Sequence, residues 1–345
     1  DYTDGCGSLL LEPQSTNLVT QSELLTGYWS GNGSGSLISD VISPNGISFS
    51  KKITTSSSGN FKGLVKSEST NWDSKTLTIS TFAKKGNTDW LYFYNIGSNN
   101  GNNGVWFNLD SGEIGIIGAA WSNVKIETCT NGWYRCSATL LFGTSTNYFY
   151  ILNSNTNNGV SSTLGNYAYI WGTQIEENSF STSYIPTQGA ISTRLQDIAT
   201  NSGNASLINS EEGVLYAEIS ALANDGTNRF ISLSDGTIAN RINIVFDTSN
   251  NINARQAPGS VNISTSGVNI LNSNKIAYKY QNGNQELWVN GIKIGTTSVS
   301  TLPIGLDRLN FDSFNGGDFM YGNIKALAVY KTALTDAQLT ALTTI

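Results

Sequence analysis

The stretch YAYIWGTQIEENSFSTSYIPTQG, residues 167–189, decides the fold of this chain. It reads as a long aromatic strand, then a polar turn, then an extended exit that ends in Tyr-Ile-Pro. The next segment, RLQDIAT from Arg194, begins a second β-rich region in which aromatic residues are scarcer. The sequence therefore predicts two all-β units that meet near residue 190.

Working outward from this stretch, short apolar and alternating segments recur along the whole chain, separated by turn residues. In the first half they lie at residues 77–83, 90–96, 105–110, 124–129, 133–142 and 148–152, and in the second half at 213–220, 228–233, 241–247, 261–264, 275–280 and 285–290. Only the C-terminus looks helical, because Thr335 and Gln338 form a capping-box pattern ahead of Leu339 and Leu342.

The predicted fold class is therefore all-β, with two antiparallel β-sandwich (jelly-roll) domains and one short C-terminal helix. We expect an N-terminal lead segment at residues 1–19, a jelly roll at 20–187 and a second sandwich at 188–345. The chain begins at Asp1 without a methionine, so we expect a processed product or the ordered part of something longer.

Composition excludes several classes of function. The 345 residues are 39% apolar and 10% aromatic, which is enough to build two cores. The net charge is −6 and the basic residues are scattered, which argues against nucleic acid as a partner. No apolar run approaches 18 residues, so we expect no membrane insertion.

The chain contains no histidine. Histidine-ligated zinc sites, Ser-His-Asp triads, Cys-His pairs and histidine general bases are thereby excluded within this sequence. Cys129 and Cys136 flank the hairpin signal Asn131-Gly132, and a disulfide between them needs a wider loop than a two-residue turn. Otherwise both cysteines are small buried apolar residues.

Strand alternation gathers aromatic and polar side chains on particular faces. Flat rings beside amides and carboxylates suit a sugar, because a ring covers its apolar face while polar groups take the hydroxyls. Such rings can equally be core, and for the group of Trp106, Asn108 and Asp110 both readings remain open. The candidate glycan-binding residues are Trp90, Tyr92, Tyr94, Trp106, Asn108, Asp110, Tyr148 and Tyr150.

The loop DSFNGGD is a weak calcium candidate through Asp312, Asn315 and Asp318, since these residues offer oxygen ligands. No other cofactor is predicted.

Several motifs in the first half resemble a phage-associated module built on a carbohydrate-binding jelly roll. They are SLLLEPQSTNL (8–18), NGWYR (131–135), WGTQIE (171–176), SYIPT (183–187) and RLQDI (194–198). Because Arg135, Gln174 and Glu176 lie in these motifs, the resemblance implies that they form a buried polar clamp between strands rather than a ligand site. The second half is similar to the laminin-G/concanavalin-like sandwich, through ELWVNGIK (286–293) and IKALAVYKTALTDAQL (324–339). The concanavalin-like glucanases carry Glu-x-Asp-x-x-Glu on one strand, and no such triplet occurs here.

The resemblance implies a non-enzymatic virion surface protein, such as a spike, fibre or tail-associated protein, that attaches to host surface glycan. It also implies an extracellular position on the virion, other virion proteins as partners, and a homo-oligomer for which a trimer is the expected form. Two alternatives remain open. One is a structural virion spacer or decoration protein without a sugar ligand, and the other is the binding region of a secreted polysaccharide-degrading enzyme.

Overall fold

A computed structural model of the chain describes residues 7–23, 28–68, 72–96, 104–143 and 147–345. Within these residues the protein is built almost entirely from antiparallel β-strands, and α1 (Asp336–Thr343) is its α-helix. The predicted all-β class with a short C-terminal helix is therefore confirmed. No helix in the described ranges has the length and apolar character needed to span a membrane.

Tertiary contacts divide the chain into two compact units. The N-terminal unit is Gln14–Leu195, and the C-terminal unit combines Asp1–Pro13 with Gln196–Ile345. The segment expected to be a separate lead is divided between them: β1 (Leu9–Leu11) pairs with a strand of the C-terminal unit, whereas β2 (Ser15–Asn17) pairs with β17 (Ser192–Arg194) in the N-terminal unit.

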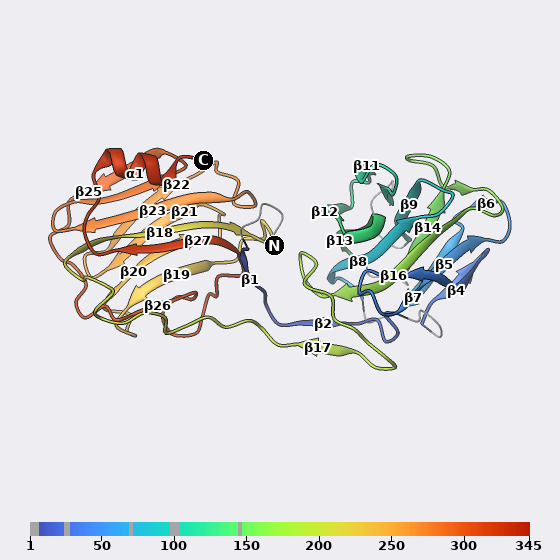
Figure 1. The fold of residues 1–345 in the computed structure, drawn as a ribbon, viewed down its shortest axis with the longest axis horizontal. Helices are drawn as coiled ribbons and strands as arrows, with labels where there is room; N and C mark the ends of the chain where they lie inside the picture. Colours follow the sequence, from blue (N-terminus) through green and yellow to red (C-terminus); the bar gives the residue numbers. More distant parts are fainter. Residues whose placement is uncertain (1–6, 24–27, 69–71, 97–103, 144–146) are drawn as a thin grey trace. The chain divides into compact units, whose positions relative to one another are not determined.

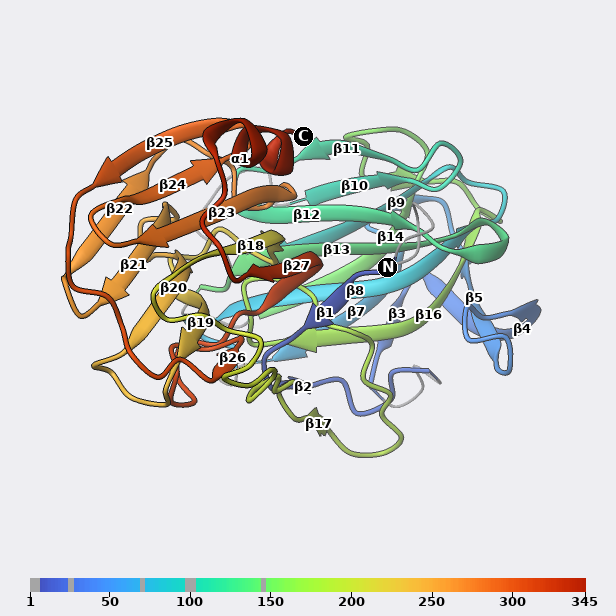
Figure 2. The ribbon, with the colours of Figure 1, turned by 60° about the vertical axis from the view of Figure 1, so that its left-hand side comes forward.

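The N-terminal unit is a sandwich of two sheets (Figures 1 and 2). The β9 sheet contains, in spatial order, β11 (Glu113–Ile117), β10 (Gly104–Asn108), β9 (Trp90–Ile96), β14 (Asn147–Ser154), β7 (Gly63–Glu68) and β3 (Ser30–Asn32). The β8 sheet contains β12 (Trp121–Thr128), β13 (Trp133–Leu141), β8 (Thr76–Lys85), β16 (Tyr167–Glu176), β5 (Phe49–Thr55) and β4 (Ser34–Ile42). A small separate ladder joins β6 (Gly59–Asn60) to β15 (Ser161–Ser162).

The core of this unit lies between the two sheets. It is made by the alternate residues of each strand that point inward, because successive side chains of a strand face opposite sides. From the β9 sheet these are Leu91, Phe93, Val105, Phe107, Phe149 and Ile151, and from the β8 sheet Ile53, Leu77, Ile79, Cys136, Ala138, Ala168 and Ile170. The side chains of the β9 sheet that point outward do not belong to this core and form a separate group.

The hairpin between β12 and β13 differs in detail from the expected two-residue turn. A single 3₁₀ turn, Thr130–Gly132, joins the strands, with Asn131 and Gly132 both at positive φ (58° and 74°). The N–H of Cys129 donates to the carbonyl of Trp133 (2.8 Å), while Cys136 pairs with Ile126. Both thiols are free, because the three-residue turn places Cys129 opposite Trp133 and Cys136 opposite Ile126, so the two cysteines do not face each other.

The C-terminal unit is also a sandwich (Figure 1). The β23 sheet contains β1, β27 (Gly322–Tyr330), β18 (Glu212–Ala221), β23 (Asn274–Gln281), β24 (Gln285–Val289) and β25 (Ile292–Thr297). The β20 sheet contains β22 (Val261–Thr265), β21 (Ile252–Ala257), β20 (Arg241–Phe246), β19 (Arg229–Ser234) and β26 (Arg308–Asn310). A mainly aliphatic core, to which Phe246 and Tyr278 also belong, fills the space between these sheets and includes Leu11 of β1.

Helix α1 covers the outer face of the β23 sheet. Leu339 is fully buried against Tyr216 and Trp288, with Leu342 partly buried beside it. The capping box predicted from Thr335 and Gln338 is present, since the Thr335 side chain accepts from the Gln338 N–H and the Gln338 side chain accepts from the Thr335 N–H. The helix is therefore a packing element that closes one face of this sandwich.

Candidate functional site

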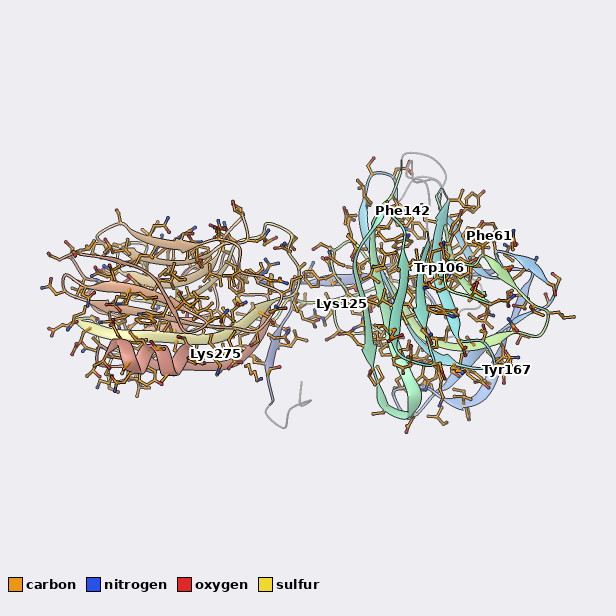
Figure 3. All side chains as sticks on the ribbon, turned by 90° about the horizontal axis from the view of Figure 1, so that it is seen from above. Phe61, Trp106, Lys125, Phe142, Tyr167 and Lys275 are labelled. Atoms are coloured by element: carbon orange, nitrogen blue, oxygen red, sulfur yellow. The ribbon has the colours of Figure 1, made fainter. Side chains whose placement is uncertain are left out.

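The outer face of the β9 sheet carries a group of aromatic side chains. Cross-strand pairing places Trp106 opposite Tyr92, and Tyr94 opposite Tyr150, so alternation in the sequence assigned these residues to the correct face. Tyr92, Trp106 and Leu152 are buried at its centre, and the partly buried residues packed around them are Phe61, Trp90, Tyr94, Tyr150 and Val160. Figure 3 shows Phe61 and Trp106 on the side of the unit away from Lys125.

Trp106 is core, not an exposed ligand-facing ring. Its side chain is 1% exposed, and it stacks on Tyr92 with 5.1 Å between ring centroids and 7° between planes. The indole N–H donates to the carbonyl of Gly159 (2.8 Å), and the Tyr92 hydroxyl donates to the carbonyl of Val160 (3.1 Å). The segment after β14 folds back over both rings, which is why they are hidden, and burial raises the pKa of the Tyr92 phenol.

Asn108 and Asp110 do not join Trp106 in a common site. The Asn108 side-chain oxygen accepts from the N–H groups of Asp110 (2.9 Å) and Ser111 (3.1 Å), so it stabilises the turn between β10 and β11. The exposed Asp110 carboxylate binds the ammonium group of Lys85 at 2.8 Å. The predicted group of ring, amide and carboxylate is therefore not assembled at this end of the sheet.

Trp90 lies half-buried at the beginning of β9, opposite Asn108 and Ser154. Its ring is so close to Gly115 that a Cβ there would lie 2.6 Å from it. The side-chain oxygen of Asn157 accepts from the N–H of Ile116 (2.8 Å) and fixes the covering segment beside this ring. Trp90 thus lies beside Gly115 of β11, at the end of the face where Asn157 joins the covering segment to this strand.

A row of rings remains partly exposed beyond the covering segment. We call Phe61, Tyr94, Tyr150 and Tyr148 the aromatic strip. Ring centroids are 4.8 Å apart for Phe61 and Tyr94, 6.0 Å for Tyr94 and Tyr150, and 6.5 Å for Tyr148 and Tyr150. Tyr148 is 38% exposed, and the other three rings are half-buried.

Phe61 was missed by sequence reasoning. It follows β6 rather than lying in an alternating strand, and its φ of 56° is uncommon for an aromatic residue. Its N–H donates to Val160 (2.8 Å), and its carbonyl accepts from the side chain of Asn32 (2.6 Å). These bonds to two distant segments hold the strained residue so that its ring completes the strip, and no local pattern in the sequence signals them.

The strip offers hydrogen-bond donors as well as ring faces. Among the described residues, no protein group hydrogen-bonds to the hydroxyls of Tyr94, Tyr148 or Tyr150. Burial, reinforced by the neighbouring Tyr148 and Tyr94, raises the pKa of the Tyr150 phenol, which therefore stays protonated at neutral pH. The surface combines apolar ring faces with neutral phenol donors and acceptors.

The predicted polar clamp is present. The Glu176 carboxylate accepts from the Ser15 hydroxyl (2.6 Å) and the Thr182 N–H (3.1 Å), and Gln174 accepts from the N–H of Ile185 (2.7 Å). Arg135 donates to the carbonyl of Thr182 (2.5 Å). These residues tie the exit after β16 to the β8 sheet, which is a structural role.

The candidate calcium residues lie in the loop after β26. Both oxygens of the buried Asp312 carboxylate accept backbone N–H groups, from Phe314 (2.6 Å) and Gly316 (3.1 Å). Asn315 and Asp318 are exposed. Across the described ranges, no three His, Cys, Asp or Glu side chains gather in a way that could hold a metal ion. Asp312 shapes the loop.

No protein-family model and no curated protein sequence matches the chain. Among solved structures, it is similar to the carbohydrate-binding module CBM40 of the Ruminococcus gnavus IT-sialidase bound to α2,3-sialyllactose, with 18% identity over 43% of this chain and 95% of that one (TM-score 0.36). It is also similar to domain 4 of the extracellular GH43 arabinanase AbnA from Geobacillus stearothermophilus, in complex with arabinotriose. The identity there is 14% over 48% of this chain and 80% of that one (TM-score 0.35).

A third similar structure is that of domains LG4–5 of the mouse laminin α1 chain, with 10% identity over 78% of this chain and 88% of that one (TM-score 0.29). The structural neighbours thus include carbohydrate-binding modules and laminin G domains.

Proposed function

We propose that the protein attaches to glycan on a host surface through the aromatic strip of its N-terminal unit, without catalysing a reaction. The observation that carries the proposal is the continuity of the strip: Phe61, Tyr94, Tyr150 and Tyr148 follow one another at 4.8–6.5 Å on one face of one sheet. Two or more sugar units of a chain can lie along such a row of rings.

The chemistry of the strip suits a neutral saccharide. A half-exposed ring covers the C–H face of a pyranose, and the phenol hydroxyls exchange hydrogen bonds with its hydroxyls. The rings are held by the covering segment and by pairing between β9 and β14, so few rotamers are lost on binding. Each ring contact is still small, and several copies of the surface would add to its strength.

The remaining parts of the proposal rest on the sequence. A non-enzymatic role is supported by the absence of histidine and of a Glu-x-Asp-x-x-Glu triplet. The virion surface, the partnership with other virion proteins and the homo-oligomer, with a trimer as the expected form, are supported by the resemblance of SYIPT (183–187) and the related motifs to phage-associated modules.

Replacing rings of the strip tests the proposal. Tyr94→Ala and Tyr150→Ala are each expected to weaken glycan binding roughly tenfold, because a ring contact contributes about 1–1.5 kcal/mol. A glycan array probed with the whole chain identifies the ligand, and calorimetric titration of that ligand measures each variant. Thermal melting of the same samples shows whether the unit remains folded.

Phe49→Ala is the matched control, since Phe49 is a similar ring, 52% exposed, on β5 of the other sheet. It should leave binding unchanged. Equal binding by Tyr94→Ala, Tyr150→Ala and the unmodified protein, with all three folded, would remove the strip as the binding surface.

A further inference from the structure

The outer face of the β20 sheet carries two arginines beside a buried amide. Ile242, Ile244 and Phe246 of β20 point into the core, so Arg241 and Asn243 lie on the opposite face. Arg255 of β21 is the cross-strand partner of Asn243 and therefore shares that face. Arg241 is two residues from Asn243 along the strand, so the three side chains are neighbours.

The loop after β26 lies beside these side chains and is bonded to β19. Its carbonyls accept from the Ser232 hydroxyl (Asp312, 2.9 Å) and from the Phe230 N–H (Asp318, 3.1 Å), which fixes the loop across part of the face. The guanidinium carbon of Arg241 lies 4.7 Å from the centroid of the Phe314 ring. Phe314 has a φ of 101°, rare for a residue with a side chain, and a strained backbone of this kind often marks a functional position.

The two arginines are poorly neutralised. Arg241 is half-buried, and none of the carboxylates in the described residues forms an ion pair with it. Arg255 forms one long ion pair within the described part of the chain, with the Asp247 carboxylate at 4.0 Å. Burial, together with the positive charge of Arg255, lowers the pKa of the Arg241 guanidinium. A bound anion would relieve this unbalanced charge.

Asn243 adds a different requirement. It is 1% exposed, and its side-chain oxygen has no hydrogen-bond partner, which is costly for a buried acceptor. A ligand hydroxyl, or a guanidinium N–H that turns toward it when a ligand binds, would satisfy this oxygen. Sulfate has no hydroxyl to donate, whereas a sugar that carries a carboxylate has both kinds of group.

We propose that this face is a second saccharide site that binds the carboxylate of an acidic sugar. Arg241 and Arg255 donate charge-assisted hydrogen bonds to the carboxylate, the ring of Phe314 borders the sugar, and Asn243 gains its missing donor. The site belongs to the C-terminal unit and differs in chemistry from the neutral aromatic strip, so each can fail without the other.

Matched pairs of ligands test the proposal on the whole chain. Trigalacturonate is compared with its methyl ester, and 3′-sialyllactose with lactose, so that each pair isolates the carboxylate. We expect at least one acidic member to bind at least about tenfold more tightly than its neutral partner. Equal binding or no binding in both pairs overturns the proposal, as does displacement of the acidic sugar by inorganic sulfate at equal concentration.

Two substitutions locate the site. Arg241→Gln and Arg255→Gln should each weaken acidic-sugar binding at least about tenfold. The melting temperature should stay the same or rise, because each substitution removes the repulsion between the two guanidinium groups. Lys275→Gln removes the same charge from β23 in the other sheet of this unit and should change nothing (Figure 3). A lower melting temperature for Arg241→Gln with unchanged binding would assign Arg241 to packing against Phe314 and refute the site.

Discussion

Trp106 should contribute to the stability of the N-terminal unit, because the segment after β14 buries its ring. Its ring packs directly over Gly104, where a Cβ would lie 2.4 Å away, and its N–H is bonded to Gly159. Trp106→Ala would leave a cavity and remove one of the two hydrogen bonds that the Gly159 carbonyl accepts, the other coming from the Ser154 hydroxyl. We expect a loss of about 3–5 kcal/mol in the free energy of unfolding of the N-terminal unit, measured by denaturant titration. An unchanged unfolding midpoint would contradict the burial.

Glu286 ties the stability of the C-terminal unit to pH. Burial alone would raise the pKa of its carboxyl group. The Trp288 N–H (2.9 Å) and the ammonium groups of Lys279 and Lys293 (3.4 Å each) outweigh this effect and lower the pKa. The stabilisation is therefore complete above the ordinary pKa of about 4.3, and it is lost as the pH falls through the lower folded value.

Glu286→Gln tests this linkage. At neutral pH the variant should be about 3–5 kcal/mol less stable, because the buried ammonium of Lys279 loses its charged partner. Urea unfolding measured from pH 7 to pH 3 should show a shallower decline for the variant than for the unmodified protein. Parallel curves would mean that Glu286 does not titrate with unfolding.

At the level of residues, the sequence predicted the face of the sheet to which a side chain points better than it predicted whether that side chain is exposed. Alternation correctly placed Tyr92, Tyr94 and Trp106 on one side of their strands, because the period of two is a property of each strand alone. It did not predict the burial of Trp106, since the covering carbonyl of Gly159 lies 53 positions away. Nor did it find the pair of Arg241 and Arg255, which only the register of β20 and β21 brings together.

At the level of elements, the capping box of α1 has a measurable effect. Thr335→Ala removes the side chain that accepts from the Gln338 N–H, and this should cost about 1 kcal/mol. Since Leu339 packs the helix on the β23 sheet, the loss should appear in the unfolding of the C-terminal unit. Thr340→Ala, at an exposed position inside the same helix, is the control and should be neutral or slightly stabilising. Equal stability of both variants would show that the cap is not needed.

Elements with local signals were the predictable ones. The strands β23 and β24 were expected from the segments 275–280 and 285–290, and the helix from its cap. The strand β1 was not expected in the C-terminal unit. Its sequence, Leu9–Leu11, is a short apolar run with no local feature to say which sheet it joins, because its partner β27 lies more than 300 positions later.

At the level of the whole molecule, the N-terminal unit is an insertion in the sequence of the C-terminal unit. The chain leaves the C-terminal unit after Pro13 and returns at Gln196. These two points are adjacent: the Glu12 N–H donates to the Asp197 carboxylate, and the Asp197 N–H donates to the Glu12 carbonyl, both at 2.9 Å. Residues 14–195 should therefore be removable without disturbing the C-terminal sandwich.

Three shortened chains test this organisation. Residues 14–195 alone should fold with the stability of that unit in the whole chain, because their core is self-contained.

Residues 196–345 alone lack β1, which exposes the edge of β27 at Gly322–Ile324 and removes Leu11, 5% exposed, from the core. The loss of one buried leucine predicts a destabilisation of about 2–5 kcal/mol. Joining residues 7–13 to 196–345 through a short glycine–serine linker should restore the stability, since Glu12 and Asp197 are already bonded. If residues 196–345 unfold at the same denaturant concentration as the linked chain, then β1 does not contribute to the stability of the C-terminal unit, and this prediction is wrong.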